Sequence, residues 1–246
     1  MARLLSNAKP ANVKPATAKS ATAKPRRRSL RPLAPARIIE LLDAEYGTVP
    51  WRPNGEPVAE LVLTLLSQNT SDSNSGRAFI RLLNAFPDWP SLLDADVKAI
   101  ERAIQPGGLA PTKAPRLQGM LREVRSRRGS FDLAFLRDWS LEEARAWLRS
   151  LPGVGPKTAA CVLLFALGMP ALPVDTHVHR VAKRLGLVPE KSTAEQAHEL
   201  LEPMLTREQI YPFHIQLIKH GRRTCTARRP KCPSCPLRTR CPSAEL

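Results

Sequence analysis

The stretch Leu151-Pro-Gly-Val-Gly-Pro-Lys-Thr-Ala-Ala-Cys-Val-Leu-Leu164 decides the fold of this chain. One helix ends before Pro152, a tight Gly-Val-Gly turn follows, and a second helix begins at Pro156, because proline suits the first position of a helix. Gly168 is placed to end that second helix. Two amphipathic helices joined by such a turn form a helix-hairpin-helix, which the stretch therefore predicts.

The turn itself consists of Gly153, Val154 and Gly155. Because glycine has no side chain, the backbone N–H groups here can approach a partner closely. They also lie beside the positive N-terminus of the next helix, and this combination favours phosphate binding. The turn is therefore predicted to hold a nucleic-acid backbone without regard to base sequence.

Lys157 lies in the first turn of the second helix. The helix dipole disfavours an ammonium group at that position, and burial would disfavour it further. A neutral lysine is a nucleophile that attacks an acetal-like or carbonyl carbon and forms a Schiff base. The alternative is that Lys157 only contacts a phosphate, and its position alone does not decide between the two roles.

Asp175 follows eighteen residues later, within Pro173-Val-Asp-Thr-His-Val-His-Arg180. It precedes an apolar helical segment that ends at Gly186, so one role for its side chain is to cap that helix. Its carboxylate could also stabilise positive charge that develops on a deoxyribose ring, or accept a proton from the lysine. The two roles are compatible.

Outward from the hairpin, apolar residues recur three or four positions apart from Ala36 onward, and no sustained alternation of two residues occurs. Helical segments are predicted around residues 38–42, 58–66, 79–86, 97–104, 117–124 and 141–148. The fold class is therefore predicted to be all-α.

The net charge of +16 lies in two end segments. Residues 1–37 carry ten Lys or Arg and residues 219–240 carry eight, neither with an acidic residue, whereas residues 38–218 sum to −1. Concentrated positive charge attracts polyanions such as nucleic acids. Residues 1–35, rich in Ala, Pro and Lys, are predicted to form a disordered basic tail.

Membrane and secretory segments are not predicted. The chain has no run of about 18 apolar residues and no apolar stretch typical of a secretory signal near its N-terminus. Four of its five cysteines lie in the last 22 residues, which is not the pattern of a secreted disulfide framework. These features predict an intracellular protein of the cytoplasm or nucleoid.

The cysteines Cys225, Cys232, Cys235 and Cys241 have the spacing C-x6-C-x2-C-x5-C. Thiolates bind zinc or iron–sulfur clusters. Structural zinc sites usually present two close pairs, and here only Cys232 and Cys235 form one. The spacing leaves both zinc and an iron–sulfur cluster open. Cys161 lies inside an apolar helix and is interpreted as a core residue.

Three motifs together resemble the endonuclease III family of helix-hairpin-helix DNA glycosylases. They are residues 151–163, the tetrad 174–177, and His220-Gly-Arg-Arg-Thr-Cys225 followed by the other three cysteines. They occur in the family's order, and the resemblance covers roughly residues 36–243.

The resemblance implies roles for these residues. Lys157 would be the catalytic nucleophile, Asp175 the catalytic carboxylate, and the four cysteines the ligands of a [4Fe–4S] cluster. Arg228, Arg229 and Lys231, between Cys225 and Cys232, would contact DNA phosphates.

Two further loops match the family's pattern. Residues 66–72 resemble the loop whose amide side chain fills the space left by a flipped base, which places Asn69 there with Gln68 adjacent. Residues 108–114 resemble the loop with an apolar wedge, which would be Leu109.

The family architecture implies a six-helix domain over residues 50–169 and a discontinuous [4Fe–4S] domain over residues 36–49 and 170–246, with a DNA groove between them. The implied activity is that of a bifunctional glycosylase and abasic-site lyase, acting as a monomer on double-stranded DNA that contains a damaged, oxidised pyrimidine or an abasic site. The alternatives are a monofunctional mismatch or adenine glycosylase, and a non-catalytic DNA-binding iron–sulfur protein.

Overall fold

The fold is described from a computed structural model that covers residues 32–52 and 55–244. Within these ranges the regular structure is helical and contains no strand, which confirms the all-α prediction. None of the helices in these ranges is both long enough and apolar enough to span a bilayer. Apart from residues 32–35, the predicted tail over residues 1–35 lies outside the described residues.

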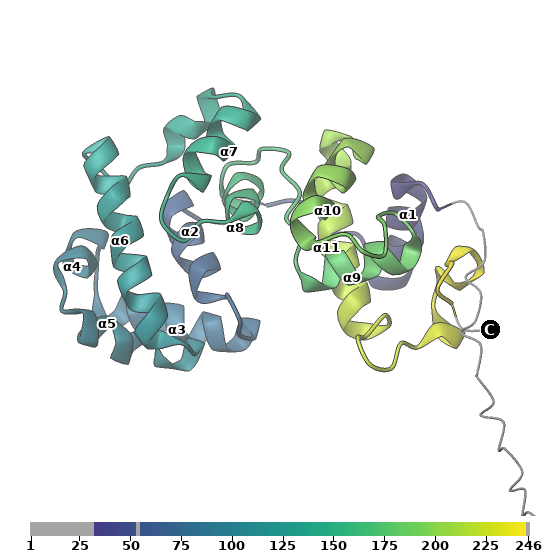
Figure 1. Ribbon diagram of the computed structural model, residues 1–246, viewed down its shortest axis with the longest axis horizontal. Coiled ribbons are helices and arrows are strands. Elements are labelled where there is room, and N and C mark those ends of the chain that lie inside the picture. Colours follow the sequence, from purple (N-terminus) through teal and green to yellow (C-terminus); the bar gives the residue numbers. More distant parts are fainter. Residues whose placement is uncertain (1–31, 53–54, 245–246) are drawn as a thin grey trace, which may run out of the picture.

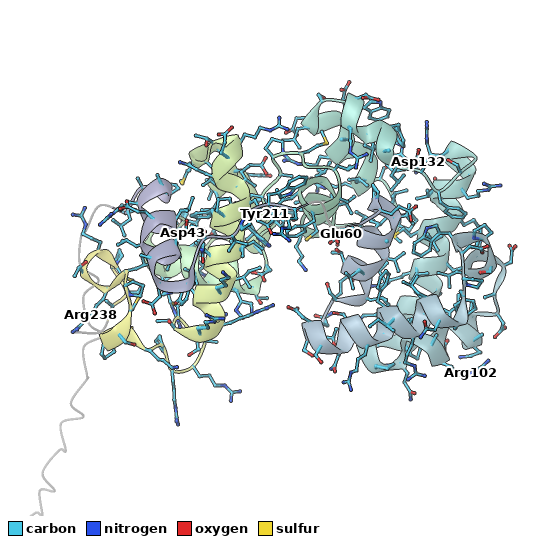
Figure 2. All side chains as sticks on the ribbon, turned by 180° about the vertical axis from the view of Figure 1, so that it is seen from behind. Asp43, Glu60, Arg102, Asp132, Tyr211 and Arg238 are labelled. Atoms are coloured by element: carbon cyan, nitrogen blue, oxygen red, sulfur yellow. The ribbon has the colours of Figure 1, made fainter. Side chains whose placement is uncertain are left out.

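The helices form two lobes (Figure 1). The helical lobe contains α2 (Pro57–Leu66), α3 (Asp72–Ala85), α4 (Trp89–Asp94), α5 (Val97–Ile104), α6 (Ala110–Arg128), α7 (Leu141–Arg149) and α8 (Pro156–Cys161). The C-terminal lobe contains α1 (Pro35–Tyr46), α9 (Thr176–Leu185), α10 (Ala194–Leu201), α11 (Arg207–Arg223) and the cysteine loop over residues 224–244. In the reverse view, Asp43 and Tyr211 lie in the C-terminal lobe, and Arg102 and Asp132 lie in the helical lobe (Figure 2).

Each lobe buries its own apolar core. In the helical lobe α2 is central, because its apolar residues are buried on several faces: Val58, Leu61, Val62, Leu65 and Leu66. A helix that is apolar around much of its circumference must be covered by other helices. In the C-terminal lobe, apolar residues of α1 pack with those of α9 and α11: Ile38, Leu42, Val178, Val181, Phe213 and Leu217.

The first helix joins the C-terminal third of the chain. The hydroxyl of Tyr46, at the end of α1, bonds to Nδ1 of His220 at 3.0 Å and to Oγ1 of Thr224 at 2.8 Å. The segment between α8 and α9 is the second connection between the lobes. In it, Leu164 packs in the core of the C-terminal lobe, whereas Ala171 packs in the core of the helical lobe. We therefore propose that the domain division follows these lobes, with the boundary within residues 164–171.

The helical lobe contains α4, a helical segment that the apolar spacing did not predict. The six residues of α4 begin after Asp88, whose carboxylate accepts from the backbone N–H of Ser91 at 2.7 Å, and Ser91 Oγ lies 3.4 Å from the backbone N of Asp88. This reciprocal capping stabilises a helix of little more than one turn, whose Leu92 is buried in the core of the helical lobe. Among the described residues, the helical lobe therefore contains α4 in addition to the helices that the apolar spacing and the hairpin predicted.

Gly168 ends the helical segment after α8, as predicted. Its contact with the ring of Trp51 provides a test of the packing at that end. Its φ is +68°, and a Cβ atom there would lie 3.3 Å from the ring of Trp51. The left-handed conformation costs an L-residue roughly 1–2 kcal/mol, so Gly168→Ala is expected to lower the free energy of unfolding by at least about that amount in urea titrations.

Gly76→Ala is the matched control. Gly76 lies inside α3 and a Cβ atom there would meet nothing within 4 Å. Alanine at such a position should raise the free energy of unfolding by roughly 0.5–1 kcal/mol. Equal effects of the two substitutions would contradict this account of Gly168.

Candidate active site

The turn of the hairpin is anchored by its central residue. The backbone N–H of Val154 donates to the carbonyl of Leu151 at 3.2 Å, and the Val154 side chain, 6% exposed, packs into the helical-lobe core. Gly153 has φ +78°, a conformation that glycine adopts without steric cost. Gly153 is exposed and Gly155 is half-buried. A partner of this turn would therefore meet its backbone, because the only side chain of the three points into the core.

Lys157 and Asp175 line the same cavity, which has a volume of about 970 Å³. Lys157 is half-buried in the first turn of α8, directly after the hairpin turn, and Asp175 is the residue before α9. The two residues come from the two lobes. The structure therefore places the predicted nucleophile and the predicted carboxylate at one site.

The carboxylate of Asp175 caps α9. Its Oδ1 accepts from the backbone N–H groups of His177 at 2.8 Å and Val178 at 2.7 Å. Two charge-assisted bonds to one oxygen fix the orientation of the carboxyl group. The capping role confirms one of the two roles that the sequence predicted, and it leaves Oδ2 outside the cap.

The residues before Asp175 are held by two histidines, of which His214 is buried and His198 is half-buried. His198 Nδ1 lies 2.8 Å from the carbonyl of Leu172, and His198 Nε2 accepts from the backbone N–H of Val174 at 3.3 Å. His214 Nδ1 lies 2.8 Å from the carbonyl of Pro173. Both histidines therefore donate from Nδ1, and His198 must be neutral to accept at Nε2.

Burial lowers the pKa of both histidines. Desolvation is the main cause in each case, and it lowers the pKa of His198 and of His214 from 6.5 to about 4. A hydrogen bond to a backbone carbonyl opposes the shift in each, at Leu172 and at Pro173, and for His214 the charge of Asp175 opposes it more strongly. Both imidazoles are therefore neutral at pH 7.

These shifts predict a dependence of stability on pH. Between about pH 4 and pH 6.5 the unfolded chain binds protons at these histidines and the folded chain does not, so stability is lost as the pH falls through this window. Each histidine contributes up to about 1.4 kcal/mol per pH unit to the slope. In urea titrations across this window, His198→Asn, which cannot take up that proton, should reduce the slope by about one proton. An unchanged slope would contradict the assignment.

The loop between α2 and α3 lines the same cavity through Ser67, Gln68, Asn69, Thr70 and Ser71. Gln68 is half-buried, and Asn69 is exposed with φ +54°. The α3 helix begins after Ser71, whose hydroxyl accepts from the backbone N–H of Asn74 at 3.3 Å. The loop that was predicted to fill the space left by a flipped base therefore faces Lys157 and Asp175.

Leu109 lies on a separate loop. It is 54% exposed with φ +53°, directly before α6, and it is not among the residues that line the cavity. An exposed leucine in the left-handed conformation is uncommon, because that conformation is strained for a residue with a bulky side chain. This arrangement is compatible with a wedge but is separate from the site of Lys157.

Sequence reasoning assigned no role to two residues at the rim of this cavity. Arg222 on α11 pairs with Asp72 at the start of α3, with N···O 2.6 Å, and both line the cavity. The pair joins the two lobes across the site, and because both side chains are well exposed it contributes little to stability. Arg222 belongs to the motif that ends at Cys225, and Asp72 is the last residue of the loop motif over residues 66–72.

The four C-terminal cysteines line one cavity of about 200 Å³. Three of them, Cys225, Cys235 and Cys241, also pack against the apolar core of the C-terminal lobe. Burial, together with the charges of the other three thiols, raises the pKa of Cys235 to about 11. A positively charged metal would offset the repulsion among the four thiolates, so the donor set fits a thiolate-bound metal group.

The arrangement of the thiols bears on the kind of metal group. Among the described residues, no three or more His, Cys, Asp or Glu side chains are arranged to hold one metal ion. The four cysteines share one cavity, and the donor set is suitable for a metal group of either kind, a zinc ion or an iron–sulfur cluster.

Arg184 on α9 fixes the start of the cysteine loop. Its guanidinium donates to the carbonyls of Thr226 at 2.7 Å and Ala227 at 2.9 Å, and lies 3.2 Å from Sγ of Cys225. The residues predicted to contact phosphates, Arg228, Arg229 and Lys231, are exposed on this loop. Cys161, by contrast, is buried in α8, and desolvation raises its pKa to about 12.

The fold and the site define a class: a two-lobed helical protein whose hairpin turn places a lysine opposite a capping carboxylate. Residues 62–206 match the HhH-GPD superfamily of base excision DNA repair proteins. An endonuclease III of Thermotoga maritima is 35% identical over 76% of this chain and 83% of its own length. The chain belongs to the HhH-GPD superfamily and, within it, to the endonuclease III family.

Two other similarities extend this comparison. A candidate DNA glycosylase of Arabidopsis thaliana is 43% identical over 66% of this chain, and the chain spans only 55% of that protein's length. A solved structure of a trapped covalent intermediate of endonuclease III with DNA superimposes with a TM-score of 0.72 and 27% identity, over 86% of this chain and 97% of that chain.

Proposed function

We propose that this protein is a bifunctional DNA glycosylase and abasic-site lyase that removes damaged, oxidised pyrimidines in base excision repair. The observation that carries the proposal is the shared cavity of Lys157 and Asp175. The partner is double-stranded DNA in the nucleoid, with a damaged base or an abasic site. One copy of the chain is sufficient, because all of the proposed groups belong to one chain.

The damaged nucleotide must first leave the base stack, because Lys157 cannot reach it inside a duplex. Turning it out costs roughly a few kcal/mol, and less when the base is damaged. The backbone of Gly153, Val154 and Gly155 and the basic residues of the cysteine loop offset this cost by binding phosphates. Asn69 and Gln68 fill the vacated space, and Leu109 separates the neighbouring bases.

The Lys157 amine then attacks C1′ of the deoxyribose. The bond between C1′ and the base nitrogen breaks, and the base leaves with the bonding electron pair and takes up a proton. The sugar ring opens to give a Schiff base between Nζ and C1′. Removal of a proton from C2′ expels the 3′ phosphate by β-elimination, which cuts the strand.

Asp175 provides the negative charge that this reaction requires. The cap of α9 uses Oδ1. Oδ2 is therefore the atom that balances positive charge on the sugar or accepts a proton from the Lys157 ammonium. Because the cap fixes the carboxyl group before substrate binds, little reorganisation is needed during the reaction.

We also propose that Cys225, Cys232, Cys235 and Cys241 hold a [4Fe–4S] cluster. The shared cavity and the thiol donor set support this assignment. When bound, the cluster supplies a rigid centre for the loop that presents Arg228, Arg229 and Lys231. It takes no part in the chemistry at Lys157.

The lyase proposal is tested by reduction with borohydride in the presence of DNA that contains an abasic site. Reduction converts the Schiff base to a stable amine, so the wild-type protein should give an adduct that survives denaturation. Lys157→Ala should give none, whereas Lys98→Ala, which removes an exposed lysine on α5, should be trapped like the wild type.

Asp175→Asn separates charge from capping in the same assay. Asparagine caps helices about as well as aspartate, so the protein should stay folded while single-turnover trapping slows by roughly 10²–10⁴-fold. Failure of the wild type to form an adduct, with DNA binding intact, would contradict the lyase and favour a monofunctional glycosylase or the non-catalytic alternative.

The cluster is tested by metal analysis of protein purified without oxygen. The expected result is about four iron and four sulfide per chain, with broad absorption in the visible range. Cys235→Ser should lower both, whereas Cys161→Ser, which alters the buried cysteine of α8, should leave the ratio of iron to folded protein unchanged. Stoichiometric zinc in a colourless preparation would contradict the proposal.

A further inference from the structure

Lys113 is a buried lysine that the proposed chemistry does not use. It lies in the first turn of α6 and is 3% exposed. Its ammonium donates to the carbonyl of Leu66 at 2.7 Å and to the carbonyl of Gly107 at 2.9 Å. Desolvation lowers the pKa of Lys113. A lysine is seldom buried unless its ammonium has a specific partner, and here both of these partners are backbone atoms.

The two carbonyls lie where the two loops that are proposed to enter DNA begin. Leu66 is the last residue of α2, three positions before Asn69. Gly107 ends a short 3-10 turn, two positions before Leu109. Within residues 32–52 and 55–244, Asn69 and Leu109 are the non-glycine residues with positive φ, at 54° and 53°. Such conformations persist only where the surrounding structure holds them.

Electrostatics favour the contact between the Lys113 ammonium and the carbonyl of Leu66. The carbonyls at the end of α2 form the negative end of its helix dipole, and an ammonium stabilises that end. Lys113 itself lies at the positive end of α6, so its side chain extends from the start of one helix to the end of another. The Gly107 backbone is also tightly packed, because a Cβ atom there would lie 3.1 Å from Cβ of Ala78 and 3.8 Å from the carbonyl oxygen of Leu66.

We propose that Lys113 is a positioning residue that fixes the two loops relative to one another, so that Asn69 and Leu109 enter the duplex as one unit. The inference rests on the proposed function, in which these residues replace the flipped nucleotide and separate its neighbours. Lys113 is needed where a paired strand must be held open. It is not needed where the abasic sugar is already unpaired.

The test compares one abasic oligonucleotide as a single strand and as a duplex. In single-turnover borohydride trapping, Lys113→Met should lower the duplex rate by about tenfold, within the usual range of coupling between contacting groups. The single-strand rate should stay within about twofold of wild type, because an unpaired abasic nucleotide leaves no gap in a duplex that Asn69 would have to fill. Lys98→Met, at an exposed lysine of the adjacent α5, is the control and should change neither rate.

A double-mutant cycle separates positioning from general destabilisation. If Lys113 acts through Leu109, then Leu109→Ala should cost less on duplex DNA in the Lys113→Met protein than in the wild type. Fluorescence of 2-aminopurine placed opposite the abasic site reports insertion directly and should rise less on binding the Lys113→Met protein. Multiplicative effects of the two substitutions, or an equal loss on both substrates, would overturn the inference.

Failure of the wild type to be trapped and failure of Lys113→Met to fold have different consequences. If the wild type traps neither substrate, the proposed function fails, and this inference fails with it. If Lys113→Met does not fold, as judged by circular dichroism, the cycle is made from Asn69→Ala and Leu109→Ala with Lys113 intact. Coupled effects would then support a fixed pair of loops, and independent effects would overturn it.

Discussion

The proposed site depends on one segment of chain that is buried in both lobes. Between Lys157 and Asp175 the backbone contributes to both cores in turn, because Leu163 and Ala171 lie in the core of the helical lobe, whereas Leu164 and Leu172 lie in that of the C-terminal lobe. Both cores therefore fix the segment. Because interiors are close-packed, the distance between the two functional groups is set by apolar burial and does not require a direct bond between them.

The C-terminal end of that segment is held by polar contacts as well. Neutral His198 and His214 bond to backbone groups of Leu172, Pro173 and Val174, and the carboxylate of Glu202 accepts from the backbone N–H of Leu172 at 2.8 Å. Asp175 then caps α9. A carboxylate that is oriented in the free protein costs less to use in a reaction, which is the advantage of a preorganised site.

Local sequence signals predicted the hairpin turn, the cap at Asp175 and the glycine at residue 168, because each depends on a few adjacent residues. The shared cavity, the buried Lys113 and the histidine contacts could not be predicted in the same way. Lys113 bonds to Leu66, 47 positions away in the sequence, and His214 bonds to Pro173, 41 positions away. Such pairs depend on how helices pack, and apolar spacing alone does not specify that packing. The short α4 was missed because its apolar residues Trp89, Leu92 and Leu93 span little more than one helical turn, and capping at Asp88 stabilises it.

The central claim is that the amine of Lys157 forms the bond to the sugar. Peptide mass spectrometry of the borohydride-reduced complex tests this most directly, because it locates the added deoxyribose on a single side chain. The account predicts that the added mass lies on Lys157, in a peptide from the hairpin and α8. An adduct on another lysine or on the N-terminal amine, with Lys157 unmodified, would contradict it.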